Sequence, residues 1–473
     1  MPIPCVGIAV LPFKPLGSQS QDEHLGLGVT DALIAKFGRL QPLAVRPTSA
    51  VLKYAGKSYD PAAVGGELGV DAVLEGTVQK VDGRVRVIVQ LINVHDGQPL
   101  WAERFDEPFT DVFAVQDAIS EQVARALKLK LTADERQRLA KRYTENPEAY
   151  QDYARGLFFR GKRTEDGLTR SIAYFKQALE KDSRYALAWA GLADAYAVSG
   201  YLNSQTLPAQ EAYGQAQAAA LKALELDNTL AEAHAALSVV KAYHDHDLRG
   251  AEAAARQAIA LQPNYATGRQ RLSIYLRDQG RLEEALAAIL RAQELDPLSL
   301  TIGSNLAYIH YLRRDYERAV AQCRKVLEIE PDYFQTLIAL GMTYEQQQKY
   351  EEAIAVLSKA REQNRGQNGI YLNTLETLGH AYASAGRRAE AEQILAELST
   401  IPAQAGDREY YSALIRAGLG ETGKVFALLE RSSASWRTPP VALMLDPRFE
   451  RLRADARYQN LFRKRLARFT PAS

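Results

Sequence analysis

The fold is decided by the stretch PDYFQTLIALGMTYEQQQKYEEAIAVLSKA, residues 331–360. The small residues Gly341 and Ala353 allow two helices to approach closely, and Leu340 and Tyr344 are the apolar groups that fill the space between them. The proline at the start of the stretch ends the preceding helix, because it removes a backbone donor and clashes with the turn before it. The stretch therefore predicts one helix–turn–helix unit.

The same features recur every 34 residues on both sides of this unit. Three columns of residues at one period predict a stack of repeats, and the period resembles that of the tetratricopeptide repeat. Looser units extend the array to about eight between residues 147 and 431, enough for each unit to bury its neighbour's apolar face in a right-handed superhelix. The columns are Pro263, Pro297 and Pro331; Leu272, Leu306 and Leu340; and Ala285, Ala319 and Ala353.

Residues 432–473 lose the period and are expected to form a helical carboxy-terminal cap. They contain the basic run Arg463-Lys464-Arg465. We interpret this run as a solvated face of the cap, with contact to nucleic acid or an anionic surface as the alternative.

The first 142 residues follow a different pattern, which predicts a small mixed α/β domain and gives the whole chain an α+β class. Asp82-Gly83 supplies the positive φ angles that a tight hairpin turn needs. The order βαβαβββα follows from strands at 7–13, 43–46, 71–81, 84–94 and 99–105, and helices at 25–37, 62–68 and 112–131.

The segments IAVLPF, DAVLEGTVQKVDGRVRVIVQLINVHDGQPLWAERFD and DVFAVQDAIS resemble the TolB amino-terminal-like domain of bacterial signalling proteins. The repeats, and the closing DPRFERLRADARYQNLFRKRL, are similar to the tetratricopeptide tails attached to that domain. In that family the module usually follows a winged-helix, Ser/Thr kinase or adenylate cyclase domain, and none of these is visible in this sequence. The resemblance implies sensing and protein interaction, and it offers no catalytic residue to transfer.

Composition sets further bounds on the class of protein. The formal net charge of +1 over 473 residues gives no overall attraction to nucleic acid or anionic membranes. The two cysteines, Cys5 and Cys323, form neither a disulfide framework nor a metal motif. No leader and no membrane span is visible, so we expect a cytoplasmic chain, or a periplasmic one if a membrane helix precedes it in the full gene.

Four local features suggest chemistry, and each has a plainer interpretation. His244-Asp245-His246-Asp247 could bind a divalent metal, but consecutive residues rarely converge on one ion, so an exposed turn is favoured. Gly26-Leu27-Gly28 lacks the third glycine of a dinucleotide site and is interpreted as a helix start. Cys323 is assigned to the core of a repeat, and Glu75 to an edge or solvent-facing position.

The inner surface of the array is the most plausible binding surface, and positions 2, 5, 6, 9 and 12 of each first helix are expected to line it. We expect an open face that binds a protein or peptide, with no cofactor, no metal and no catalysis. The alternatives are a cell-envelope assembly factor, or the regulatory part of a kinase or cyclase whose catalytic domain is absent here. The candidate residues are Gln270, Arg271, Arg277, Ser304, Tyr308, Tyr311, Gln335, Met342 and Glu345.

Overall fold

The structure is a computed structural model that describes most of the chain. Every structural statement below refers to these residues. They are 6–16, 20–40, 43–109, 112–161, 165–202, 207–363, 368–400, 407–432 and 444–469.

The amino-terminal domain is built on one mixed sheet with the strand order β3-β1-β4-β5-β6. Strand β1 is parallel to β3 and β4, whereas β4, β5 and β6 form an antiparallel meander, as predicted. Asp82 and Gly83 both have positive φ angles, 50° and 73°, which confirms the tight turn between β4 and β5. The strands are β1 (Val6–Val10), β2 (Lys14–Pro15), β3 (Leu43–Val45), β4 (Ala72–Val81), β5 (Arg84–Asn93) and β6 (Pro99–Pro108).

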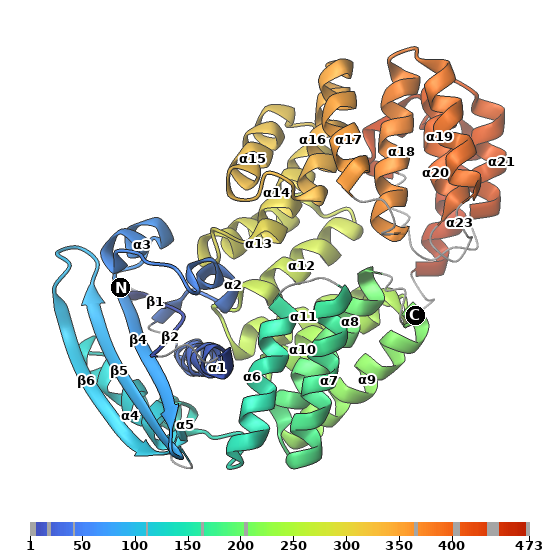
Figure 1. The fold of residues 1–473 in the computed structure, drawn as a ribbon. Helices are drawn as coiled ribbons and strands as arrows, with labels where there is room; N and C mark the ends of the chain where they lie inside the picture. The colour runs from blue at the N-terminus through green and yellow to red at the C-terminus, as the bar shows by residue number, and fades with distance from the viewer. Residues whose placement is uncertain are drawn as a thin grey trace.

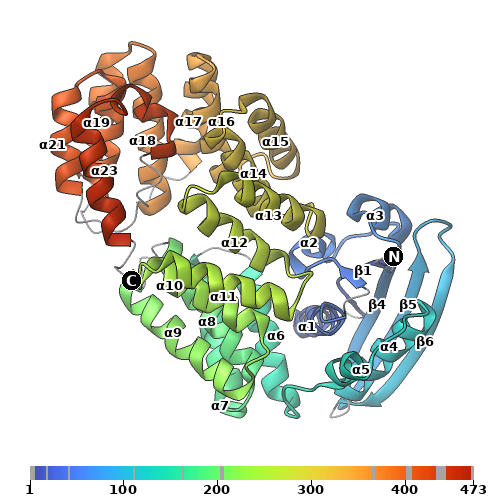
Figure 2. The same cartoon turned by 180° about the vertical axis from the view of Figure 1, so that it is seen from behind.

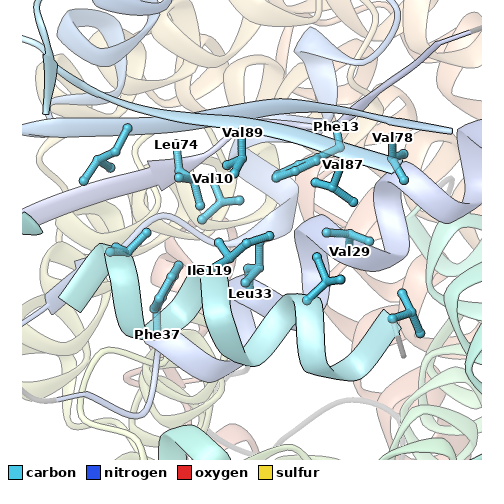
Figure 3. Close-up of a cluster of buried hydrophobic side chains, with 14 of the residues drawn as sticks. Val10, Phe13, Val29, Leu33, Phe37, Leu74, Val78, Val87, Val89 and Ile119 are labelled. Atoms are coloured by element: carbon cyan, nitrogen blue, oxygen red, sulfur yellow. The ribbon is translucent and has the colours of Figure 1, made fainter. Parts of the chain in front are cut away.

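Helices α1 and α4 cover one face of this sheet and enclose its main core (Figure 3). Alternate residues of β5 point into that core, and Val85, Val87 and Leu91 are fully buried. The helices of this domain are α1 (Ser20–Phe37), α2 (Thr48–Val51), the 3-10 helix η1 (Leu52–Tyr54), α3 (Pro61–Leu68), α4 (Val112–Ala126) and α5 (Ala133–Ala140).

The prediction of one long helix over residues 112–131 is wrong, because two helices occupy this region. Helix α4 ends with Lys128 in the left-handed region at φ 53°, and the Leu129 amide donates to the Ala124 carbonyl across the end of the helix. Helix α5 then begins with a reciprocal cap in which Thr132 Oγ1 accepts from the Glu135 amide, and the Glu135 carboxylate accepts from the Thr132 amide.

The predicted helix start at Gly26-Leu27-Gly28 is also wrong, because α1 begins at Ser20 and both glycines lie inside it. Both glycines lie where a Cβ has no room. A Cβ on Gly26 would collide with the Phe13 carbonyl, and one on Gly28 would lie 2.6 Å from the Ala154 Cβ of the first array helix. The glycines therefore serve close packing rather than phosphate binding.

The remainder of the chain is a helical array that curves away from the amino-terminal domain (Figures 1 and 2). In the described residues its helices form eight consecutive pairs whose members contact each other. The helices are α6 (Pro147–Gly161), α7 (Glu165–Lys181), α8 (Ala186–Leu202), α9 (Ala209–Leu226), α10 (Ala231–Tyr243), α11 (Leu248–Leu261), α12 (Ala266–Asp278), α13 (Leu282–Leu295), α14 (Leu300–Leu312), α15 (Tyr316–Ile329), α16 (Phe334–Gln346), α17 (Tyr350–Gln363), α18 (Asn368–Ser384), α19 (Arg388–Thr400), α20 (Arg408–Gly418) and α21 (Thr422–Ser432).

The residues that define the repeat have the roles that the sequence predicts. Ala285, Ala319 and Ala353 are all fully buried between the helices of their pairs. A Cβ on Gly341 would collide with the side chain of Leu357 on the paired helix. Small residues at these positions therefore set the short distance between the two helices of a pair.

The turn inside four successive pairs contains one residue with a positive φ angle at the same repeat position. These residues are His246, Gly280, Arg314 and Gln348, with φ angles of 57°, 82°, 62° and 61°. A left-handed residue ends the first helix and reverses the chain, so the backbone keeps the period even where the residue type changes.

The amino-terminal domain contacts three successive junctions between pairs. Lys141 pairs with Asp227 between α9 and α10 at 2.7 Å, and Asn264, between α11 and α12, donates to a β3 carbonyl at 2.6 Å. Arg46 donates to the Glu294 carbonyl near the end of α13 at 2.8 Å. Only the Arg46 contact satisfies a carbonyl that a helix end leaves free; the other two are an ion pair and a hydrogen bond from a side-chain amide.

The described residues end with the 3-10 helix η4 (Pro447–Leu452) and helix α23 (Ala456–Phe469). Phe449 is fully buried, with its ring centroid 6.1 Å from that of Tyr410 in α20 and 5.8 Å from that of Tyr458 in α23. In the basic run, Arg463 and Lys464 are exposed, and the side chain of the third residue, Arg465, lies outside the description. No helix of the described residues is long and apolar enough to cross a membrane.

Candidate functional site

The candidate inner-surface residues all lie on first helices, α12, α14 and α16. The expectation of an open face is wrong for four of them, because the chain itself covers them. Tyr311 is completely buried, and Ser304, Met342 and Glu345 are no more than 5% exposed. Three groups of contacts account for this burial.

The first group joins α6, α8 and α12 through charge. Asp194 on α8 pairs with Arg160 on α6 at 2.9 Å and with Arg271 on α12. The side chains of Arg271 and Asp194 are only 11% and 15% exposed. Burial opposes the charge of Arg271, but Asp194 outweighs it and holds the pKa of the guanidinium above its ordinary value. Arg271 therefore binds its own chain.

The second group lies between α12 and α14. The Arg277 guanidinium pairs with Asp278 at 2.7 Å and lies 5.3 Å from the centre of the Tyr308 ring. The rings of Tyr308 and Tyr311 stack with centroids 5.8 Å apart. Tyr308 is half-buried, so part of this side chain remains accessible.

The third group attaches the carboxy-terminal segment to the inner surface. The Tyr311 hydroxyl donates to Asp446 at 3.2 Å, and Arg448 pairs with Asp446 at 2.7 Å and also with Glu376 on α18. The side chains of all three charged residues are 7% exposed or less. Burial opposes the charge of Arg448, but Asp446 and Glu376 outweigh it and hold its pKa well above its ordinary value. Residues far apart in the chain thus form one buried ionic set.

A second carboxylate of the inner surface, that of Glu345, is also buried. Glu345 on α16 lies 2.6 Å from His380 on α18 through its Oε1 atom, and Ser384 donates to the same oxygen. Glu345 Oε2 and His380 Nε2 are buried and have no hydrogen-bond partner among the described residues. The inner surface of α16 and α18 is therefore acidic and only partly satisfied by its own chain.

The remaining candidates are less enclosed. Gln270 and Gln335 are half-buried, and Gln335 accepts from the Tyr333 hydroxyl at 3.0 Å. Ser304 forms a hydrogen bond with Thr336 on the next first helix. Gln270, Tyr308 and Gln335 are thus half-buried, as are Arg271 and Arg277.

Several residues of the site were not among the sequence candidates, among them Glu376, His380, Asp446 and Arg448. Counting from Leu378-Gly379 places Glu376 and His380 at positions 5 and 9 of their repeat, so the positional rule covers them. Asp446 and Arg448 lie in the closing DPRF segment, and local spacing does not reveal where that segment docks.

A cavity of about 50 Å³ lies at the junction of the two domains. Its wall contains the aromatic residues Phe113, Tyr143, Tyr150, Tyr153 and Tyr185. The cations that line it are engaged: Lys36 and Arg142 with Asp117, Lys141 with Asp227, and Arg39 with Tyr143. The cavity therefore lies within the packed contact between the two domains.

The other local features can now be placed. Residues 244–247 form a turn between α10 and α11 in which the Asp247 carboxylate caps the next helix at Gly250 with a 2.8 Å hydrogen bond. Cys323 is fully buried, as predicted, and burial raises the pKa of its thiol to about 12. Cys5 lies outside the described residues. Glu75 lies on the central strand β4, not on an edge, and is half-buried beside Gln90, which donates to it at 2.6 Å.

Four sequence profiles of known families match stretches of the chain. The tetratricopeptide repeat matches residues 242–300 and 332–402. The profile described as "Anaphase-promoting complex, cyclosome, subunit 3" matches residues 278–360. The profile described as "HilA/YgeH-like transcriptional regulator, second domain" matches residues 4–122. The chain thus carries tetratricopeptide repeats, as predicted, behind a domain similar to one found in a transcriptional regulator.

A curated relative, "Putative adenylate cyclase 3" of Rhizobium meliloti (strain 1021), is 32% identical over 232 residues. The match covers 49% of this chain and 39% of that protein, so the chain spans about two fifths of the relative's length.

Solved structures of repeat proteins are similar in part. Pseudomonas aeruginosa pilF is 24% identical over 44% of this chain and 90% of its own, with a TM-score of 0.35. YrrB, described as "a TPR protein with an unusual peptide-binding site", is 21% identical over 40% and 91%, with a TM-score of 0.29. The Cut9-Hcn1 structure is 16% identical over 75% and 73%, with a TM-score of 0.41.

Proposed function

We propose that this chain is a protein- or peptide-binding module of a bacterial signalling or transcriptional regulator. The observation that carries the proposal is the inner surface of the repeat array, where charged and aromatic side chains from several first helices lie together. Such side chains are the usual anchors of protein interfaces. The regulator-type profile over residues 4–122 supports the regulatory setting.

Finer parts of the proposal rest on the resemblance of the sequence. The amino-terminal domain, residues 1–142, is of the TolB amino-terminal-like type, the repeat array occupies residues 147–431, and residues 432–473 cap it. The chain has no catalytic activity of its own, binds no nucleic acid, needs no cofactor and works in the cytoplasm. Its partner is a protein or a peptide.

A second candidate function is favoured by the cyclase relative. In this version the chain is the regulatory part of a protein whose catalytic domain is an adenylate cyclase. Incubating the purified chain with ATP and Mg²⁺ and measuring cyclic AMP tests whether the chain itself lacks cyclase activity. We expect no product from the chain alone, and cyclisation that a point mutation in this chain abolishes would contradict the non-catalytic assignment.

The binding proposal is tested by capture of a partner followed by affinity measurement with the purified pair. Tyr308→Ala and Gln335→Ala remove half-buried side chains of the inner surface, and Lys325→Ala removes an exposed one from the second helix α15 as the matched control. We expect at least one inner-surface variant to lose about tenfold or more in affinity, and the control to lose nothing. Unchanged affinity in both inner variants, with unchanged melting, would place the partner elsewhere, with the amino-terminal domain as the next candidate.

A further inference from the structure

The carboxy-terminal segment Leu445–Arg453, here called the cis segment, lies on the surface that the proposed function assigns to a partner. Leu445 packs in one cluster with Tyr311 and Met342, two of the predicted partner-binding residues. Asp446 accepts from the Tyr311 hydroxyl, and Arg448 reaches Glu376. At its other end, Glu450 pairs with Arg314 on the turn after α14.

The contacts are complementary in charge. Without the cis segment, the inner surface here presents the carboxylates of Glu345 and Glu376 beside the tyrosines 308, 311 and 410. The segment supplies one guanidinium, from Arg448, which contacts Glu376 and is held in place by Asp446 through two hydrogen bonds of 3.0 and 3.1 Å from its Nε. Acidic and aromatic surroundings are what an arginine side chain binds best.

A cap does not need this chemistry. Well-packed apolar residues hold a cap at least as firmly as a buried ion pair, because removing charges from water costs about as much as the pair returns. The apolar part of the cap already exists in Phe449, Leu452, Tyr458 and Leu461. The buried ions therefore specify which side chain occupies the surface rather than adding to the stability of the cap.

We propose that the inner surface of α14, α16 and α18 is a recognition site for an arginine-centred peptide and that the cis segment occupies it as an internal competitor. The partner segment carries a carboxylate two residues before the arginine and an aromatic residue one residue after it, in the pattern Asp-x-Arg-Phe. This inference rests on the proposed function and names its ligand class. A partner binds when the cis segment leaves, and the tether gives that segment an effective concentration of about millimolar.

The test uses a fluorescein-labelled peptide with the sequence MLDPRFERLRAD, residues 444–455, and measures its binding by anisotropy. The receptors are the full chain and its Arg448→Ala variant, in which the internal competitor is weakened. A third receptor combines Arg448→Ala with Glu376→Gln, which removes the carboxylate that the arginine contacts. The control peptide has alanine in place of the arginine.

We expect the peptide to bind the Arg448→Ala chain at least tenfold more tightly than the wild type. The double variant and the control peptide should each lose at least tenfold of that affinity. If Arg448→Ala melts below the assay temperature, Arg448→Lys replaces it, since it keeps the charge but loses the two-pronged geometry.

Equal binding to all three receptors, or no binding to a folded Arg448 variant, would show that the cis segment is only a cap and would overturn the inference. In that case a partner whose binding depends on Tyr308 or Gln335 would still support the proposed function, so the two failures are distinguishable.

Discussion

Replacing Asp194 by alanine should loosen the first half of the array, because this carboxylate neutralises two guanidiniums. Removing one member of a buried ion pair typically costs about 3–5 kcal/mol, since it leaves a charge without a partner. Arg271 is only 11% exposed and loses its sole ion-pair partner in the described structure, whereas Arg160 is 36% exposed and can be hydrated. We therefore expect a loss at the lower end, about 3 kcal/mol.

Repeat arrays do not unfold as one unit, so a melting temperature shows the direction of a change in stability but not the size of this local loss. Native-state hydrogen exchange does, because it reports the opening of each helix pair. A loss of about 3 kcal/mol corresponds to exchange roughly a hundredfold faster in α8 and α12, at one tenfold step per 1.4 kcal/mol.

The matched control is Asp166→Ala on α7, whose carboxylate pairs with Arg170 in an exposed position. An exposed pair of this kind contributes less than about 1 kcal/mol, so exchange should change little. Arg271→Ala should cost less than Asp194→Ala, because Asp194 keeps Arg160. Equal exchange in the Asp194 and Asp166 variants would refute the view that the inner surface is held together by buried charge.

Three further predictions test packing, ionisation and burial. Gly28→Ala should destabilise the chain by about 1–3 kcal/mol through overpacking. A Cβ on Gly214 would meet nothing within 4 Å, so Gly214→Ala should stabilise its helix by up to about 1 kcal/mol. Shifts of the melting temperature in opposite directions check both predictions. The pKa of Glu421 is lowered to about 2, chiefly by Arg388, so its stabilising effect is present above pH 5 and lost as the pH falls towards 2. The melting temperatures of wild type and Glu421→Gln should converge over that range, and a gap that persists at pH 2.5 would contradict this sign. In a Cys5→Ser variant, Cys323 should resist iodoacetamide at pH 8 until the chain is denatured, and rapid labelling of the native variant would show that Cys323 is accessible.

The repeat array could be predicted because its determinants are local and periodic. Gly341 and Ala353 act within one helix pair, and the 34-residue spacing repeats the same packing in the neighbouring pairs. The hairpin at Asp82-Gly83 was equally visible, since its backbone angles depend on two adjacent residues. The candidate inner-surface residues lie on the first helices of their pairs, where the repeat register puts them.

Whether the inner surface is open or covered could not be predicted, because this depends on contacts between distant parts of the chain. Tyr311 and Asp446 are separated by 135 residues, and no spacing rule brings them together. The split of the predicted helix at residues 112–131 had a local indication in Thr132 and Glu135, a capping pair that marks a new helix start. The repeat register also covered Glu376 and His380, and extending it to every unit would have included them.

The three attachments made by Lys141, Asn264 and Arg46 have a mechanical consequence. A helical solenoid behaves like a spring, and bending or twisting it changes the distances between successive junctions by small, cumulative amounts. A rigid body fixed to three neighbouring coils cannot follow such a deformation. Any ligand that alters the pitch between the second and fifth helix pairs must therefore strain or break at least one attachment, and the strain falls on the helix ends and the β3 backbone of the amino-terminal domain.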